Sequence, residues 1–464
     1  MDAIYDISKT IANTEYEQLT PKAIEGAKYS ILDTLSTTIA GSTAGAGCKE
    51  VVELVKEGGG KPESSILCYG GKVPVWMAAF ANGAMSHTLD FDDTDGTTAM
   101  HPGVGTVPVG FAMAERIGKV NGKNLITSIC LGADVVLRLG NAGKKGQGSF
   151  KWLINQVYAY FGGTATCGKL LKLNEEQLVD AFGIVLMQTS GTYEPVVATG
   201  GFIRGMWPAF TSKASAISAL MAQKGIGGSK ESLEGKAALF QSFLDGNYDR
   251  HFLVDELGKK FYISDLGFKA WPCNGIAQPY IEATLDIVKK NNVKPQDIDE
   301  ITVFVSDFAK LLVEPLEKRL NPKTTMDAKG SLPYIVAVAA IKNDVKIEDF
   351  TISGIKNAEV LRLAQKVKPQ YDANLAGGER GWTGISPGRV EIKTLNGQRY
   401  IKQVDVALGN SKNPMTKEQH NKKFKDCAVY SAKPLSSSDI NSVIQMVDNL
   451  EELDDVSDIV KILS

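Results

Sequence analysis

Residues 76–95 read WMAAFANGAMSHTLDFDDTD, and this stretch decides how the rest of the sequence is interpreted. Its first part is rich in alanine and almost wholly apolar, which predicts a helix buried on all sides. Its second part carries four aspartates within six residues, immediately after that helix. The buried helix predicts a closely packed helical domain, and the carboxylates at its end indicate either a chemical site or a solvated turn.

The segments on both sides repeat the helical pattern. Apolar residues at 24, 27, 31, 35 and 39 follow a Thr20-Pro21 start, which suits an N-cap and a first helical turn. Glycine and alanine are frequent at the positions where these helices would touch, so we expect a large, tightly packed helical bundle. Further helices are expected at residues 108–118, 123–138, 162–172, 176–190 and 210–224.

The pattern changes after residue 266. Residues 301–305 form a short β-branched run, and residues 390–406 alternate on both sides of Asn396-Gly397, which predicts a hairpin with a two-residue turn. Helices are also expected before the hairpin, at residues 276–290, 331–341 and 357–367. Helical spacing returns after the hairpin, at residues 416–430 and 439–463.

We therefore predict a mainly α protein in two domains. The large all-helical domain comprises residues 1–266 plus 406–464, and an inserted, smaller α+β lid domain comprises residues 267–405. The length of 464 residues agrees with more than one domain, because a single hydrophobic core stops growing well below this size.

Composition excludes several classes of function. The formal net charge is −2, so no nucleic acid is expected as a partner. The first residues lack the basic start and apolar run of a signal peptide, and no long apolar run predicts a membrane span. The six cysteines are scattered without a C-x-x-C pair, which favours reduced thiols over a zinc site or disulfides. We expect a cytoplasmic protein.

The acidic stretch could bind a metal, and spacing tests that idea. An EF-hand loop that begins at Asp90 needs glycine at position 6 and glutamate at position 12, where this sequence has Asp95 and His101. A magnesium motif of the terpenoid-synthase type, counted from Asp92, would need a third aspartate at the place of Gly96. A transition-metal site of two histidines and a carboxylate stays open, as does a solvated turn or N-cap without chemical function.

Acid–base chemistry demands less of the same segment. Two of the four histidines of the chain, His87 and His101, flank the aspartates. His101 precedes Pro102 in a polar loop, where an imidazole can reach a ligand and a nearby carboxylate can fix its tautomer. An N-capping or surface histidine is the alternative for His101.

The residues at 86–94, SHTLDFDDT, followed by His101-Pro102, resemble the central motif of the MmgE/PrpD family. The resemblance covers nearly the full chain, because further similar motifs follow in order. They are FGG at 161–163 with GKLL at 168–171, KAWPC at 269–273, DAKGSLPY at 327–334, and NPM at 413–415 with Lys423-Phe424 and Cys427. The family includes 2-methylcitrate dehydratase, cis-aconitate decarboxylase and iminodisuccinate epimerase.

This resemblance implies a helical large domain with an α+β lid, a homodimer, and no metal or organic cofactor. It also implies a cleft between the domains for a small di- or tricarboxylate. By motif match, the pocket residues of the family fall on Asp90, Thr94, His101, Lys269 and Tyr334.

The residue types at these positions suit a polycarboxylate. Arg204 lies where many relatives have a basic residue, and it would bind substrate together with Lys269, Thr94 and Asn274. Cations beside a carboxylate lower the barrier to removing the neighbouring proton, because they neutralise the charge that develops. His101 is then expected to move that proton.

Supporting roles fall to three other residues. Asp90 would orient His101, Tyr334 would donate to a leaving group or carboxylate, and Lys269 would act in catalysis as well as in binding. Lys269 and Tyr334 also have alternatives without a catalytic role, as a surface lysine and as a core residue respectively. Cys273 is interpreted as a buried structural thiol rather than a nucleophile, because no basic partner stands beside it.

Two departures from the family pattern put the substrate in question. Residues 204–208 read RGMWP, with Trp207 where relatives commonly have histidine, and Asn274 stands where the decarboxylase often has histidine. The sequence therefore predicts a cofactor-independent lyase, a dehydratase or decarboxylase of a small di- or tricarboxylate. The alternatives are an epimerase or isomerase that uses the same proton abstraction, and a non-catalytic binding protein that has kept the fold.

Overall fold

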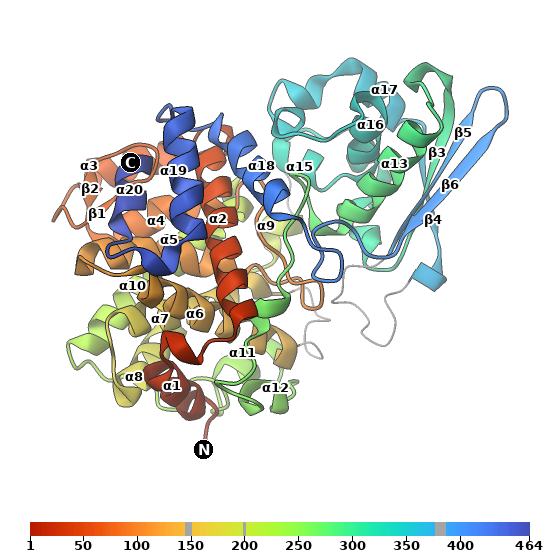
Figure 1. Cartoon of the computed structure of the whole chain (residues 1–464). Helices are drawn as coiled ribbons and strands as arrows, with labels where there is room; N and C mark the ends of the chain where they lie inside the picture. Colours follow the sequence, from red (N-terminus) through yellow and green to blue (C-terminus); the bar gives the residue numbers. More distant parts are fainter. Residues whose placement is uncertain (144–150, 198–200, 376–386) are drawn as a thin grey trace. The chain divides into compact units, whose positions relative to one another are not determined.

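The computed structural model describes residues 1–143, 151–197, 201–375 and 387–464, and the chain divides into two compact units. The first unit contains the N-terminus, the C-terminus and most of the helices, and the second contains the larger sheet (Figure 1). The first unit consists of residues 1–88, 100–266 and 416–464, and the second of residues 89–99 and 267–415.

The first unit is a helical bundle. Its second helix, α2, begins as expected, with Thr20 as N-cap accepting a hydrogen bond from the backbone of Ala23 at 3.2 Å and Pro21 in the first turn. The helices of this unit are α1 (Ile4–Asn13), α2 (Pro21–Ala44), α3 (Cys48–Gly58), α4 (Val75–Ser86), α5 (Pro102–Ile117), α6 (Gly122–Ala142), α7 (Ile154–Leu170), α8 (Glu175–Leu186), α9 (Glu194–Val197), α10 (Trp207–Gln223), α11 (Leu239–Leu244), α12 (His251–Val254), α18 (Lys417–Ala428), α19 (Ser437–Asp448) and α20 (Ser457–Leu463).

Small residues allow the central helices to approach closely. A Cβ added to Gly105 of α5 would come within 2.9 Å of the Ala159 Cβ of α7, and one added to Gly83 of α4 would lie 2.6 Å from the Pro208 carbonyl oxygen of α10. This packing explains why α5 is longer than periodicity predicts. Glycine costs helix propensity in its first turns, but the close contact with α7 outweighs that cost.

Helix α6 is long and apolar enough to cross a membrane, with a mean hydropathy of 1.4 over its most apolar window. That window is entirely buried inside the first unit, as expected for the core helix of a bundle. The helix also carries a buried ion pair, in which Arg138 Nε lies 2.6 Å from Asp134 Oδ2. Arg138 further donates to the carbonyl oxygens of Phe252, Asp255 and Lys260, so its charge is satisfied within the core.

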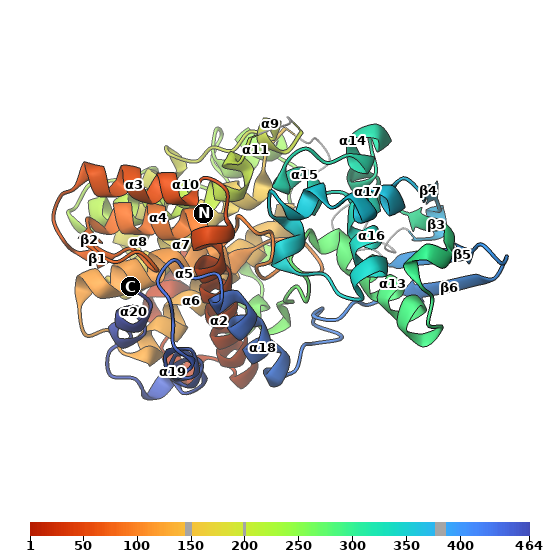
Figure 2. The ribbon, with the colours of Figure 1, turned by 90° about the horizontal axis from the view of Figure 1, so that it is seen from above.

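The last helices of the chain return to the first unit, where α18 packs on α2 (Figure 2). A second buried ion pair lies at this contact, with Lys423 Nζ 2.6 Å from Asp33 Oδ1. His420 stacks on Tyr29 at a ring separation of 4.1 Å. Burial, together with the nearby Lys423, lowers the pKa of His420 to about 3, so this histidine is a neutral core residue.

The first unit is not entirely helical, contrary to expectation. Residues Ser64–Ser65 and Lys72–Val73 form a short antiparallel pair, β1 and β2. Asn82 of α4 holds it to the bundle, because its side chain accepts from the Leu67 backbone at 2.9 Å and donates to the Ser65 carbonyl at 3.1 Å.

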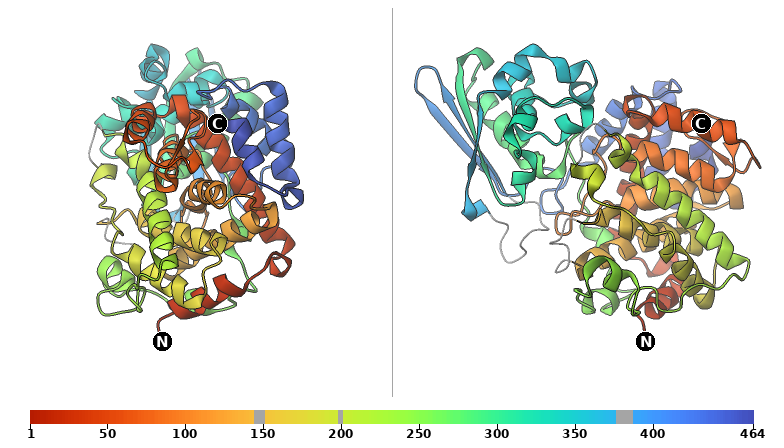
Figure 3. Two further views of the ribbon diagram at one scale, coloured as in Figure 1. Left: turned by 90° about the vertical axis from the view of Figure 1, so that its left-hand side faces the viewer. Right: turned by 180° about the vertical axis from the view of Figure 1, so that it is seen from behind.

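The second unit is built on a four-stranded sheet of order β4-β3-β5-β6, in which β3 is parallel to β4 and antiparallel to β5. Helices α13, α16 and α17 lie on one side of this sheet (Figures 1 and 3). Buried and half-exposed residues alternate along β5, as one covered face requires. The strands are β3 (Ile298–Val305), β4 (Val367–Tyr371), β5 (Gly388–Thr394) and β6 (Arg399–Val404), and the helices are α13 (Gln278–Lys290), α14 (Leu316–Leu320), α15 (Thr325–Lys329), α16 (Leu332–Lys342) and α17 (Ala358–Ala364).

The predicted β5–β6 hairpin is present, but its turn differs from the two-residue turn expected. The Gly397 backbone N–H donates to the Thr394 carbonyl at 2.9 Å, and the Thr394 N–H donates to Gln398 at 2.9 Å. Gly397 has φ +85°, whereas Asn396 is not among the residues with positive φ. The connection is therefore a three-residue loop that ends in a left-handed glycine.

The mainly α fold class is confirmed, and the role of the second unit as a lid stays a prediction. Sequence pattern alone did not indicate that residues 89–99 belong with the second unit. Hydrogen bonds between three backbone segments hold these residues in the second unit. Thr94 and Gly267 exchange backbone hydrogen bonds of 2.9 and 3.2 Å, and the next residue, Phe268, donates to Gly409 at 2.7 Å.

Gly409 is required where these segments meet. Its φ is +93°, and a Cβ at this position would lie 1.8 Å from the Phe268 carbonyl oxygen. Gly397 offers a matched comparison in the same unit, since it has φ +85° and nothing within 4 Å of an added Cβ.

We expect Gly409→Ala to destabilise the protein more than Gly397→Ala. The hairpin variant bears only the cost of a left-handed alanine, about 1–2 kcal/mol. The Gly409 variant adds an overlap with backbone that cannot move aside, worth about 1–3 kcal/mol more. Urea unfolding of the two purified variants measures the difference, and equal losses of stability would show that the 94–267–409 contact is loosely packed.

Candidate active site

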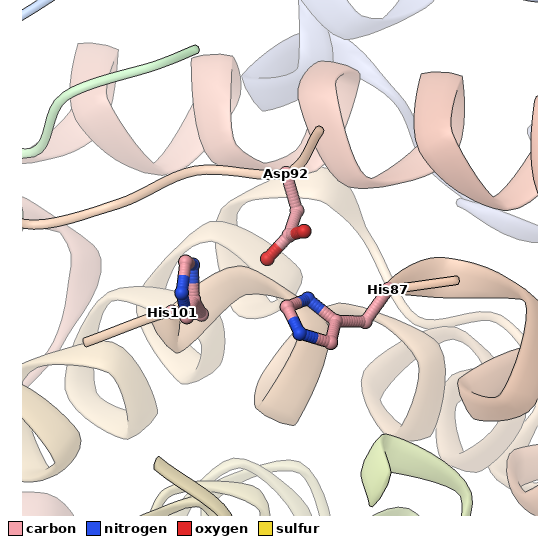
Figure 4. A group of neighbouring side chains, drawn as sticks. All are labelled: His87, Asp92 and His101. Atoms are coloured by element: carbon pink, nitrogen blue, oxygen red, sulfur yellow. The ribbon is translucent and has the colours of Figure 1, made fainter. Parts of the chain in front are cut away.

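His87 and His101 lie side by side in the first unit (Figure 4). Their ring centroids are 5.1 Å apart. His87 is the C-cap residue of α4 and is buried, while His101 is the N-cap residue of α5 and is half-buried. The pair therefore joins the end of one core helix to the start of the next.

His101 does not act as an N-capping side chain. Although His101 stands at the N-cap position, its side chain makes no capping hydrogen bond, and the residue is half-buried rather than fully exposed. Its backbone N–H donates to Asn155 Oδ1 at 3.0 Å, which fixes the loop from which the imidazole projects.

Trp207 forms an apolar wall beside His87. Its ring centroid lies 5.3 Å from that of His87, and the side chain is buried with Val104 and Ala159. The departure from the family pattern at this position therefore places an aromatic ring against one of the two histidines. An indole brings bulk and one N–H donor where a histidine would bring a titratable group.

The acidic stretch contributes a buried ionic cluster in the second unit. Lys269 Nζ lies 2.7 Å from Asp90 Oδ1 and 3.8 Å from Asp92 Oδ1, and all three side chains are buried. Burial alone would lower the pKa of Lys269. The charges of Asp90 and Asp92 and the hydrogen bond to Asp90 outweigh burial and hold that pKa above its ordinary value. Lys269 is therefore a permanent cation and not a surface lysine.

Asp90 has an unusual backbone conformation. Its φ is +50°, in the left-handed region that aspartate tolerates better than most residues. The chain leaves the first unit after Thr88, so this turn lies at the crossing and brings the Asp90 carboxylate to Lys269. Strained backbone at a buried ion pair is typical of sites where geometry is held for a function.

The four aspartates of this stretch do not share one role. Asp95 Oδ2 accepts from the backbone of Thr97 at 3.2 Å and of Thr98 at 2.6 Å, so it caps a local turn. The interpretation as an N-cap or turn is thus correct for Asp95, whereas Asp90 and Asp92 pair with Lys269.

Asn274 and Thr94 lie close to this cluster. Asn274 donates to Asp90 Oδ2 at 3.4 Å through its side chain and accepts from the Ile276 backbone at 3.0 Å. Thr94 is buried, and its backbone forms the bridge to Gly267. Thr94 and Lys269 also line a small cavity of about 30 Å³, which has room for one or two water molecules but not for a polycarboxylate.

Arg204 belongs to the first unit. It is half-buried in a short 3₁₀ helix, Ile203–Met206, directly before Trp207. Burial raises the pKa of the Tyr193 phenol, and the Arg204 guanidinium acts against that shift, so the two side chains are neighbours.

Tyr334 does not have the environment predicted for a catalytic residue. It is fully buried in α16, and its hydroxyl donates to the carbonyl oxygen of Asp349 at 2.7 Å, with the Gly354 carbonyl at 3.1 Å. Burial raises the pKa of this phenol, which keeps it protonated. A tyrosine has a single hydroxyl proton, and here that proton is donated to backbone carbonyls of the core. The alternative interpretation of Tyr334 as a core residue is therefore favoured.

Cys273 agrees with the structural interpretation given to it. Its side chain is fully buried, and burial followed by the charge of Asp90 raises the pKa of its thiol. A thiol that stays protonated is a poor nucleophile. Sequence reasoning overlooked its neighbour Lys329, a buried lysine inside the DAKGSLPY motif. Its place inside a motif already quoted for the family resemblance was the signal that could have singled it out.

Two protein-family models match most of this chain. The model of the MmgE/PrpD N-terminal domain matches residues 5–251, and that of the MmgE/PrpD C-terminal domain matches residues 271–450. The chain belongs to the MmgE/PrpD family. The resemblance of its motifs to this family is thereby confirmed, while the cofactor, dimer and site-residue expectations that came with it stay predictions.

Curated relatives from the MmgE/PrpD family are similar over most of the chain. The cis-aconitate decarboxylase of Homo sapiens is 26% identical over 456 residues, which cover 95% of this chain and 90% of that protein. The cis-aconitate decarboxylase of Aspergillus terreus (strain NIH 2624 / FGSC A1156) is 23% identical over 478 residues, covering 99% and 95%. That of Mus musculus is 24% identical over 409 residues, covering 84% and 79%.

We expect Lys269→Met to be strongly destabilising. The substitution leaves two buried carboxylates without their cation, and breaking a buried ion pair in this way costs about 3–5 kcal/mol. Urea unfolding monitored by circular dichroism measures the loss. The exposed Lys290–Asp286 pair supplies the control, because Lys290→Met should cost less than about 1 kcal/mol. Equal effects in the two variants would contradict the buried cluster.

Tyr334→Phe separates the core role from the catalytic role. Removing the hydroxyl leaves a buried carbonyl unsatisfied, so we expect a loss of about 1–3 kcal/mol in stability with kcat and KM unchanged. Unfolding curves and steady-state kinetics on the same preparation decide between the roles. A fall in kcat of more than about tenfold, with unchanged stability, would restore Tyr334 to the reaction.

Proposed function

We propose that this protein is a lyase that decarboxylates or dehydrates a small di- or tricarboxylate, without a metal or organic cofactor. The observation that carries the proposal is one short stretch of chain. It runs from His87 through Asp90 and Asp92, the partners of Lys269, to His101. This stretch thus carries two histidines able to move a proton and the two carboxylates that hold a buried cation, and proton transfer next to a carboxylate requires both an acid–base group and a cation.

Decarboxylation is the favoured form of this chemistry, because relatives that match over most of the chain are named cis-aconitate decarboxylases. In the proposed step, the bond between carbon and a carboxylate breaks and carbon dioxide leaves. The electron pair remains on the substrate, delocalised toward a neighbouring carboxylate. His101, in its protonated form, then donates a proton to carbon and recovers it from water, while Lys269 stabilises the negative charge that develops.

The histidine geometry favours a lyase over an epimerase. An epimerase needs one acid–base group on each face of the reacting carbon. Reacting atoms stand about 3–3.5 Å apart in a productive complex, so two such groups would be about 6–7 Å from one another. The rings of His87 and His101 lie side by side, with centroids 5.1 Å apart, which argues against these two histidines as the opposed acid–base pair of an epimerase.

The remaining assignments complete the proposal. Arg204 would bind a substrate carboxylate with its planar guanidinium, and Thr94 would donate a hydrogen bond. Asp90 and Asn274 would hold Lys269 and its surroundings in place rather than contact substrate. We also propose a homodimer in the cytoplasm. The six buried, free thiols are consistent with a reducing compartment, and the dimer rests on family resemblance.

The test is a panel of di- and tricarboxylates incubated with the protein in heavy water and followed by NMR. We expect one tricarboxylate to lose carbon dioxide and to gain a single deuterium at the carbon that bore it. His101→Ala should lower kcat by about 10²–10⁴. His251→Ala is the control, because His251 is exposed and paired with Asp249, and it should leave kcat unchanged.

Other outcomes contradict parts of the proposal. Deuterium exchange without net conversion would indicate an epimerase. Loss of activity on dialysis against a chelator, restored by a metal ion, would contradict the cofactor-independent mechanism. If His101→Ala retained full activity on the best substrate, the assignment of proton transfer to His101 would be wrong.

A further inference from the structure

The charge of the Asp90–Asp92–Lys269 cluster poses a problem for an anionic substrate. Two carboxylates surround one ammonium group, so the cluster carries a net negative charge when all three groups are ionised. Lys269 cannot turn fully toward a substrate carboxylate without leaving Asp90 buried and unpaired, which is strongly unfavourable. In addition to Arg204, a substrate with more than one carboxylate therefore calls for a further cation beside this cluster.

The second unit supplies such a cation in Lys329. Among its described residues, Lys269 and Lys329 are the buried lysines, with 1% and 3% of their surface exposed. Lys329 ends the short helix α15, whose start is fixed by a capping box between Thr324 and Asp327.

Hydrogen bonds connect Lys329 to the cluster through one residue. The Asn274 backbone N–H donates to the Lys329 carbonyl at 3.3 Å, and the Asn274 side chain donates to Asp90 at 3.4 Å. Burial is the main cause that raises the pKa of the neighbouring Cys273 thiol, and the charges of Lys269 and Lys329 act against it. The charges of both lysines thus act on the same buried thiol.

We propose that Lys329 is a second carboxylate-binding residue, which holds a substrate carboxylate other than the one next to the reacting carbon. The inference rests on the proposed function, since it assumes a substrate with at least two carboxylates. It assigns different tasks to the two lysines. Lys269 is held by Asp90 and stabilises the charge that develops in the reaction, whereas Lys329 binds a carboxylate that does not react and so sets the affinity.

The first experiment measures binding of propane-1,2,3-tricarboxylate, a saturated probe, by calorimetry. Lys329→Met should weaken binding at least tenfold, because hydrogen bonds to a charged group are worth about 1.5–3 kcal/mol. Lys329→Arg, which keeps the cation, should bind within about threefold of the unchanged protein. Lys323→Met is the matched control from the same segment, since Lys323 is exposed, and its affinity should not change.

Two further readouts separate binding from a structural role. Affinity should depend less on salt in Lys329→Met than in the unchanged protein, because one attractive charge is gone. With the reacting substrate, the same variant should raise KM at least tenfold while kcat changes less, as expected for an interaction equal in ground and transition states. Should Lys329→Met fail to fold, Lys329→Gln replaces it with the same expectations.

The outcomes distinguish failure of this inference from failure of the proposed function. If the unchanged protein binds the probe and Lys329→Met binds it equally well, the role of Lys329 is wrong and the lyase proposal stands. Weaker binding with an unchanged salt dependence and no recovery in Lys329→Arg also overturns it, in favour of a structural role. If the unchanged protein neither binds the probe nor converts any member of the carboxylate panel, both proposals fail.

Discussion

The burial of charge constrains this molecule more than any other interaction. Lys269 is almost completely removed from solvent, and an isolated ammonium in such a place would cost several kcal/mol. The carboxylates of Asp90 and Asp92 offset this cost by pairing with the ammonium group, and they come from a part of the sequence far from Lys269. The ion pair thus closes a long loop of chain and holds residues 89–99 within the second unit.

Several local features follow from that one constraint. Asp90 takes a left-handed backbone conformation and reaches Lys269, and Thr94 forms a backbone bridge with Gly267 just before it. Gly409 has no side chain where one would overlap the Phe268 carbonyl. Asn274 joins Asp90 on one side to the backbone of Lys329 on the other. Backbone strain, a glycine and a side-chain amide therefore all serve the position of a single ammonium group.

Local patterns in the sequence predicted much of the fold. Thr20-Pro21 marked the start of α2, and the alternation around Asn396-Gly397 marked the hairpin of β5 and β6. Both signals lie within a few residues of the structure they specify. The turn type was missed because it depends on which residue takes positive φ, and Gly397 alone does so.

The candidate site was predictable only where the motif itself carries the information. Asp90, Lys269 and His101 were singled out, but no local pattern could show that Asp90 binds Lys269 or that His87 lies against Trp207. Tyr334 belongs to the same motif as Lys329, and the motif could not reveal which of the two faces backbone carbonyls. Such distinctions depend on tertiary contacts between residues distant in sequence, which composition and spacing do not encode.

The path of the chain has a consequence for how this protein can be divided. It passes between the two units at residues 88–89, 99–100, 266–267 and 415–416, so neither unit is one continuous piece of sequence. A gene fragment that ends between the two family-matched regions, after residue 251, would lack Lys269 yet retain Asp90 and Asp92. Such a fragment would expose acidic residues and apolar surface that the intact chain buries. The two family-matched regions therefore have to be expressed together, and neither can be replaced alone by the corresponding region of a homologue.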